Sequence, residues 1–181
     1  MSADDHALLV IDVQSGMFNG TRIPPIHDAR LLLGRIKTVL DAARQSGTRI
    51  IYIRHCGPSG HLLEAGTANW QIHPLLAPRE DEAIIDKRTP DAFHETTLMT
   101  ELSAARVKRL IVVGAQSEVC VDTTCRRAFT LGFDATLVSD AHSTWDNDTL
   151  TADQIIRHTN ETLAGWFVQI ASTADIERLL S

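Results

Sequence analysis

The stretch KRLIVVGAQSEVCVDTTCRRAFTLG, residues 108–132, joins two patterns that together decide the fold. Its first part, residues 108–115, is a nearly unbroken apolar run rich in β-branched side chains, which is typical of a strand covered on both faces in a parallel sheet. Its second part, residues 119–131, has helical spacing and stops before Gly132, and glycine commonly follows the last turn of a helix. The stretch therefore predicts a strand followed by a helix.

The same alternation extends in both directions along the chain. Further apolar strand patterns occupy residues 6–13, 48–55, 82–87, 134–140 and 166–172, and further helical patterns occupy residues 28–46, 95–106 and 151–164. Strands that alternate with helices form βαβ units, and right-handed crossovers between them build an open, doubly wound sheet. The sequence predicts a single domain spanning residues 1–181: a three-layer α/β/α sandwich around a mainly parallel, six-stranded, Rossmann-like sheet.

Composition excludes several classes of function. The net charge is −6 and the chain has no basic cluster, so nucleic acid is not an expected partner. No apolar stretch reaches the roughly 18 residues of a membrane helix, and the start MSADDHALLV lacks the pattern of a signal peptide. We therefore expect a protein of the cytoplasm. Three cysteines, an odd number, do not indicate a disulfide framework.

Cofactor motifs are missing. The chain contains no GxGxxG, no GxxxxGK[ST] and no GxSxG, so neither a nucleotide site nor a serine-hydrolase elbow is predicted. The spacings of His55, His61 and His73 match no tight metal-ligand pattern, so we expect no metal. The Gly- and Pro-rich residues 56–81 form the one long irregular interval, and such segments are often functional.

Ionisable groups collect at the carboxyl ends of the predicted strands, where open α/β sheets bind their ligands. The residues at these ends are Asp12, His55, Lys87, the turn 115–120, and Asp140 with His142. This convergence predicts a site along one edge of the sheet.

Cys120 is the candidate nucleophile of this site. Near the first turn of a helix, the helix dipole is expected to lower the pKa of its thiol. Asp12 ends the first strand, which lies beside the fourth in the common strand order 3-2-1-4-5-6, and is the candidate general base. Lys87 has a stem long enough to hold Asp12 and to stabilise negative charge.

Each of these three residues also has an ordinary explanation. Cys120 alone would be a small buried hydrophobe, Asp12 a turn cap and Lys87 a solvated surface lysine. Their combination at strand ends that can be neighbours favours catalysis. Cys125 lies five residues further along the helix and is predicted to be core, while Cys56 is either at the pocket rim or simply packed.

Three motifs resemble those of isochorismatase-like cysteine hydrolases, a superfamily that includes nicotinamidases, N-carbamoylsarcosine amidohydrolases and isochorismatases. The motifs are LLVIDVQSGMF (8–18), DKRTPDAF (86–93) and VVGAQSEVCVDTTCRRAFTLGFDATLVSDA (112–141). The resemblance implies a catalytic triad of Asp12, Lys87 and Cys120, and a cis peptide between Ala115 and Gln116. It also implies an oxyanion hole formed by the backbone N–H groups of Gln116 and Cys120, no cofactor, and a homo-oligomer.

The walls of the substrate pocket follow from the same resemblance. They would include Gln14, Phe18, His55, Trp70 and Phe93. For each aromatic side chain, core packing is the alternative explanation.

Departures from the family narrow the expected function. The Asp-x-His-Pro-x-x-His metal motif of nicotinamidases is absent from the corresponding stretch, IRHCGPSGH (53–61). Isochorismatases proper lack the nucleophilic cysteine. We therefore expect a cysteine hydrolase that cleaves a C–N bond of a small amide, carbamoyl or lactam-type substrate through a thioester. The alternatives are a vinyl ether hydrolase of the isochorismatase type, a catalytically silent scaffold, and a redox-sensing protein that pairs Cys120 with Cys125, although their spacing suits a disulfide poorly.

Overall fold

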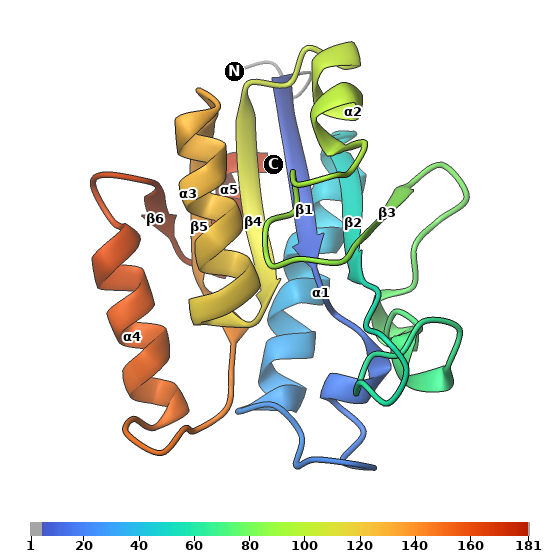
Figure 1. Cartoon of the computed structure of the whole chain (residues 1–181). Helices are drawn as coiled ribbons and strands as arrows, with labels where there is room; N and C mark the ends of the chain where they lie inside the picture. Colours follow the sequence, from blue (N-terminus) through green and yellow to red (C-terminus); the bar gives the residue numbers. More distant parts are fainter. Residues whose placement is uncertain (1–4, 181) are drawn as a thin grey trace.

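A computed structural model describes residues 5–180 of the chain. Its six strands form one parallel sheet in the order β3-β2-β1-β4-β5-β6 (Figure 1). The strands are β1 (His6–Ile11), β2 (Arg49–His55), β3 (Ala83–Lys87), β4 (Arg109–Ala115), β5 (Asp134–Ser143) and β6 (Gln169–Ala171). The predicted fold class and the predicted strand order are both confirmed.

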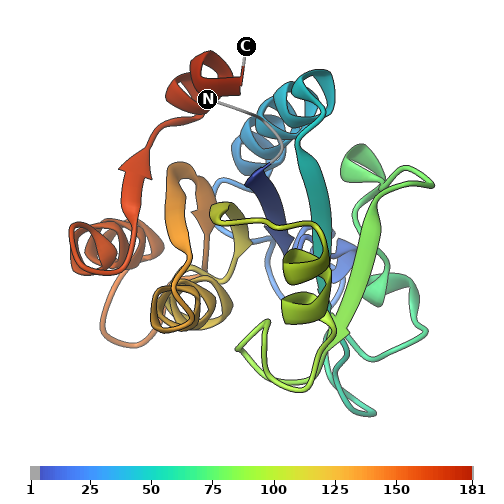
Figure 2. The same cartoon turned by 90° about the horizontal axis from the view of Figure 1, so that it is seen from above.

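Helices cover both faces of the sheet and complete the three layers. They are α1 (Ala29–Ser46), α2 (Leu98–Ala104), α3 (Asp122–Thr130), α4 (Ala152–Leu163) and α5 (Thr173–Leu180). Figure 2 shows α1 and α5 on one face and α2, α3 and α4 on the other. No helix within residues 5–180 is both long and apolar enough to cross a membrane.

Strand β1 shows why the strand patterns are almost continuously apolar. Leu8 and Val10 pack on the side of α1, whereas Leu9 and Ile11 pack on the side of α2 and α3, and all four are fully buried. A strand in the middle of a three-layer sandwich has no solvent face, so the alternation of polar and apolar residues disappears.

The C-terminal segment differs from the sequence-based expectation. The expected strand 166–172 contains only the three residues of β6, and it is followed by α5, which we did not predict. Asp140 accepts hydrogen bonds from the backbone N and the Oγ1 of Thr173, at 2.8 and 2.9 Å, and so anchors the start of α5. Because α5 has only eight residues, about two turns, its amphipathic pattern is too short to stand out in the sequence.

Candidate active site

Three ionisable side chains meet beyond the carboxyl ends of the central strands. Asp12 directly follows β1, Lys87 is the last residue of β3, and Cys120 lies in the π-helical turn η5 (Ser117–Val121) between β4 and α3. Lys87 Nζ lies 2.8 Å from Asp12 Oδ2 and 3.1 Å from Cys120 Sγ. The structure thus brings together the carboxylate, the ammonium group and the thiol that the sequence placed at separate strand ends.

Strand lengths explain how Lys87 reaches across the sheet. Strand β1 ends at Ile11, opposite Ile53, whereas β2 and β3 continue to the pair His55 and Lys87. The lysine stem therefore crosses beyond the end of β1, where Asp12 lies.

The ammonium group of Lys87 is fully hydrogen-bonded although its side chain is completely buried. It donates to Asp12 Oδ2, to Cys120 Sγ and, at 3.1 Å, to the carbonyl oxygen of Thr89, which uses all three N–H groups. Burial acts to lower the pKa of Lys87, but Asp12 and Cys120 outweigh it and the pKa is raised. Lys87 is therefore a permanent cation, and the carboxylate of Asp12 is its counter-charge.

Asp12 has an unusual backbone and one unused oxygen. Its φ angle is 51°, a left-handed conformation that non-glycine residues rarely adopt and that is concentrated at functional sites. Oδ2 binds Lys87, whereas Oδ1 is buried and makes no hydrogen bond to any described residue. Besides burial, the carboxyl group of Asp12 raises the pKa of the Cys120 thiol by its charge and by a side-chain hydrogen bond, so it is close enough to accept the thiol proton.

The expected lowering of the Cys120 pKa is wrong for this structure. Burial raises the pKa of the thiol to about 12, the charge of Asp12 adds to the rise, and Lys87 offsets only part of it. The expected placement is correct, since Cys120 lies in the π-helical turn η5 that runs directly into α3, but burial outweighs the effect of the helix start on the pKa. Because the resting thiol keeps its proton, a neighbouring base is needed to create the nucleophile.

The backbone before Cys120 has the expected unusual geometry. The peptide bond between Ala115 and Gln116 is cis, and Gln116 is the residue that precedes η5. The turn is held by its own backbone, since the carbonyl oxygen of Gln116 accepts from the N–H groups of Val119 and Val121 at 3.2 and 3.0 Å. The oxyanion role of Gln116 and Cys120 stays a prediction.

Gln14 is used by the protein itself. Its Nε2 donates to the carbonyl oxygens of His55 and Trp70, both at 2.9 Å, and its Oε1 accepts from the backbone N–H of His55 at 2.9 Å. The side chain is fully buried. Both N–H groups of the Gln14 amide are therefore occupied. Gln14 holds the backbone at His55 and Trp70 in place, whereas a contact with substrate was expected.

Two of the predicted aromatic wall residues also have partners within the protein. Phe93 is buried and stacks on Phe133 with ring centroids 5.8 Å apart, which favours the core-packing explanation. Phe18 packs edge-on against His73 at 5.3 Å.

Trp70 and His55 remain candidates for substrate contact. Trp70 carries the guanidinium of Arg54 over its ring at 3.5 Å, and its Nε1 donates to Cys56 Sγ at 3.1 Å. His55 is only partly buried, but its Nδ1 is buried and has no hydrogen-bond partner among residues 5–180. Burial and the charge of Lys87 lower the pKa of His55, so it presents a neutral imidazole beside the triad.

The remaining histidines near the site bind backbone. His61 Nδ1 accepts from the N–H of Leu63 at 3.0 Å, and His73 Nδ1 accepts from the N–H of Leu75 at 3.3 Å. Within the described part of the chain, no three His, Cys, Asp or Glu side chains gather as metal ligands would. The metal-free site stays a prediction.

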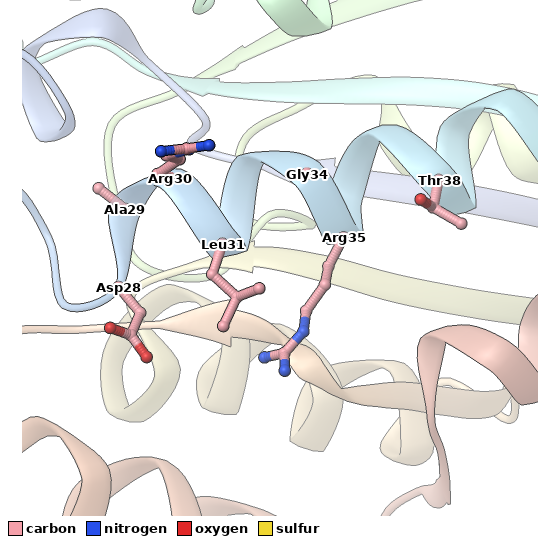
Figure 3. A pocket seen from close by; sticks show the side chains of 7 residues that line it. All are labelled: Asp28, Ala29, Arg30, Leu31, Gly34, Arg35 and Thr38. Carbon is pink, nitrogen blue, oxygen red and sulfur yellow. The ribbon is translucent and has the colours of Figure 1, made fainter.

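A surface hollow of about 650 Å³ lies at the start of α1. It is lined by Asp28 and by residues of α1 between 29 and 38, none of which belongs to the triad. Figure 3 shows Asp28, Leu31 and Arg35 projecting from the same side of this helix. One exposed helix face offers no converging reactive groups, so the candidate active site is the buried triad.

Alkylation should distinguish the three thiols, all of which are free. We expect iodoacetamide to modify Cys120 at least about tenfold faster than Cys125, since thiol reactivity follows access and thiolate character. Cys125 is fully buried in the core, and burial, together with the charge of Asp122, raises the pKa of its thiol to about 12. Peptide mapping over time measures both rates, and faster labelling of Cys125 would contradict the assignment.

A doubly wound α/β sheet with an Asp, a Lys and a Cys at the carboxyl ends of its strands defines a candidate thiol-dependent enzyme. The family model of the Isochorismatase domain matches residues 6–171. The chain therefore belongs to the isochorismatase family.

Individual relatives agree with this assignment. Streptothricin hydrolase from Streptomyces noursei is 36% identical over 141 residues, which cover 78% of this chain and 50% of that protein. The secreted isochorismatase effector Isc1 from Verticillium dahliae is 30% identical over 97% of this chain and 92% of that protein. A cysteine hydrolase from Pseudomonas syringae pv. phaseolicola has a crystal structure with a TM-score of 0.90 and 26% identity, covering 99% of this chain and 94% of that one. The chain spans about half the length of the streptothricin hydrolases that it matches.

Proposed function

We propose that the protein hydrolyses a C–N bond of a small amide, carbamoyl or lactam-type substrate through a thioester on Cys120. The observation that carries this proposal is the buried cluster in which Lys87 bridges Asp12 and Cys120 at 2.8 and 3.1 Å. A thiol, a carboxylate with a free oxygen and a fixed cation are the groups that nucleophilic acyl transfer requires.

The first half of the reaction forms the acyl-enzyme. Asp12 Oδ1 takes the proton of the Cys120 thiol, and the sulfur attacks the substrate carbonyl carbon to form an S–C bond. The carbonyl electron pair moves to oxygen, where the N–H groups of Gln116 and Cys120 would stabilise it, each donor contributing about 3–4 kcal/mol. When the C–N bond breaks, Asp12 returns its proton to the departing nitrogen.

The second half regenerates the enzyme. Water attacks the thioester carbon and gives one proton to Asp12, and the acyl group leaves as a carboxylic or carbamic acid. The proton on Asp12 then returns to the sulfur. Lys87 keeps its charge throughout and stabilises the negative charge as it moves between Asp12 and Cys120.

The relatives support this class of reaction. Two of those reported above are named as a streptothricin hydrolase and a cysteine hydrolase. In this protein, the feature that fits a covalent thiol mechanism is Cys120 within hydrogen-bonding distance of Lys87.

Vinyl ether hydrolysis is the second candidate. The similarity to Isc1, named as an isochorismatase effector, extends over 97% of this chain and favours it. Such a reaction protonates a carbon–carbon double bond and needs no thiol nucleophile. Cys120→Ala therefore separates the candidates: it abolishes amide hydrolysis and leaves vinyl ether hydrolysis in place.

The experiment is a screen of primary amides, carbamoyl compounds, lactams and isochorismate. The expected result is release of ammonia or amine, or the opening of a lactam ring by addition of water, for one class, with an acyl adduct on wild-type protein in the intact mass spectrum. Cys120→Ala is the matched control and should show no adduct. Turnover of amides without any dependence on Cys120 would overturn the proposal.

We expect activity to survive the removal of metal ions. His61 and His73 use their Nδ1 atoms to accept hydrogen bonds from backbone N–H groups, and the proposed mechanism needs no metal. After exhaustive chelation and dialysis, kcat should stay within about twofold of its starting value. A metal-dependent enzyme would instead lose several kcal/mol of transition-state stabilisation and most of its turnover. Loss of turnover that zinc restores would contradict this expectation.

The proposed setting is a cytoplasmic homo-oligomer that acts on a free small molecule. The negative net charge and the absence of a basic cluster from the sequence support a small-molecule partner rather than nucleic acid.

A further inference from the structure

Three polar side chains outside the triad form a continuous hydrogen-bonded chain that ends in the loop of Cys120. Ser117 Oγ lies 2.8 Å from His142 Nδ1, and His142 Nε2 lies 3.0 Å from Asn160 Oδ1. Ser117 is in η5, three residues before Cys120, whereas His142 belongs to β5 and Asn160 to α4. This hydrogen-bonded series thus connects η5, the turn that contains Cys120, to β5 and α4.

The direction of each hydrogen bond follows from Asn160. Its Nδ2 donates to the carbonyl oxygen of Ser139 at 3.0 Å, so its Oδ1 faces His142 and can only accept. His142 must therefore carry its proton on Nε2, and its Nδ1 is an acceptor for the hydroxyl of Ser117. Burial lowers the pKa of His142, against smaller opposing effects of Asn160 and Asp140, which keeps the ring neutral as this arrangement requires.

The polar atoms of these side chains are already engaged with one another. Ser117 Oγ and both ring nitrogens of His142 have partners within this hydrogen-bonded series, so we assign neither residue a bond-making or bond-breaking step. A buried polar chain stabilises a protein no better than apolar side chains of the same shape, and its advantage is a unique geometry. The turn that receives it is π-helical, a rare form that is frequent at functional sites.

We propose that His142 and Asn160 are positioning residues that act through Ser117 to hold the turn from Gln116 to Cys120 in the geometry of acyl transfer. This inference rests on the proposed function. The hydrogen-bonded series Ser117–His142–Asn160, here called the tether, holds the turn from the side of β5 and α4. Lys87 holds the Cys120 sulfur from the side of β3. Together they determine where the nucleophile and the backbone N–H groups lie relative to a bound carbonyl.

The test uses two variants of equal size at one position. His142→Asn keeps a hydrogen-bond acceptor at the place of Nδ1 and can still bind Ser117. His142→Leu introduces a side chain of similar shape to Asn that has no acceptor. We expect His142→Leu and Ser117→Ala to lower kcat about 30- to 100-fold with little change in KM, as misplacement by about 1 Å does. His142→Asn should retain kcat within about fivefold, because the bond to Ser117 remains.

Two controls separate positioning from general destabilisation. Ser139→Ala removes a hydroxyl from β5 whose one hydrogen bond among residues 5–180 goes to the carbonyl oxygen of Ala171, so its kcat should match that of wild type. The rate at which iodoacetamide labels Cys120 should also stay unchanged in Ser117→Ala, since alkylation needs the triad but no oxyanion hole. Equal kcat values for His142→Leu and His142→Asn, or a parallel fall in kcat, alkylation rate and melting temperature, would overturn the inference.

Hydrogen exchange gives a measurement that needs no substrate. In Ser117→Ala, the backbone amides of residues 116–121 should exchange about tenfold faster than in wild type, while those of β1 do not change. If the amides of residues 116–121 exchange at the wild-type rate in Ser117→Ala, the positioning role is wrong, even if the screen finds a substrate. A wild-type protein that forms no acyl adduct contradicts the proposed function instead, so the two failures are distinguishable.

Discussion

Replacing Asp12 with Asn should lower kcat by about 10,000-fold, the upper end of what a general acid–base group contributes. The amide keeps the size of the side chain but cannot accept the thiol proton or return it to the departing nitrogen. One residue serves both halves of the reaction, and the raised pKa of Cys120 means that the thiol does not ionise without help. The measurement is kcat on whichever amide the screen identifies.

The control for Asp12→Asn must address the charge of Lys87. The variant leaves a completely buried ammonium group without its counter-charge, and breaking a buried ion pair costs about 3–5 kcal/mol. Circular dichroism and the melting temperature report that loss, and the double variant Asp12→Asn with Lys87→Met restores neutrality. A well-folded Asp12→Asn protein that kept more than about a tenth of wild-type kcat would show that Asp12 is not the base.

Replacing Gly114 with Ala should lower the free energy of unfolding by about 4 kcal/mol or more, which is exceptional for one methyl group. Gly114 in β4 pairs with Ile11 in β1, and its φ angle is +126°. A Cβ atom there would lie 2.0 Å from the carbonyl oxygen of Ile11, a backbone atom that cannot rotate away. The two central strands would have to separate, and Asp12 and Cys120 follow directly from them.

Gly34→Ala is the matched control. Gly34 is exposed within α1, and a Cβ added to it meets nothing within 4 Å. Alanine should therefore stabilise this helix by about 0.5–1 kcal/mol. Denaturant unfolding of both variants measures the difference, and the argument fails if Gly114→Ala is as stable as wild type.

Local patterns were enough to predict most of the fold and the composition of the triad. The apolar run 108–115 and the helical spacing after it are properties of neighbouring residues, so they are readable without knowledge of the rest of the chain. The meeting of Asp12, Lys87 and Cys120 could also be expected, because parallel strands joined by crossovers end at the same edge. The weak points were short elements such as α5, whose eight residues are too few for a helical pattern to be recognised.

Only the tertiary structure decided which side chains at that edge are free to act. Asp140 was expected at a strand end like Asp12 and Lys87, and Gln14 was expected in the pocket wall. Packing commits Gln14 to two backbone carbonyls and Asp140 to the start of α5. His142 stood among the strand-end residues without a role until its contacts with Ser117 and Asn160 were seen. The pKa of Cys120 rises where its place in the chain suggested a fall, because desolvation depends on the atoms that surround a group, and those atoms come from segments far apart in the sequence.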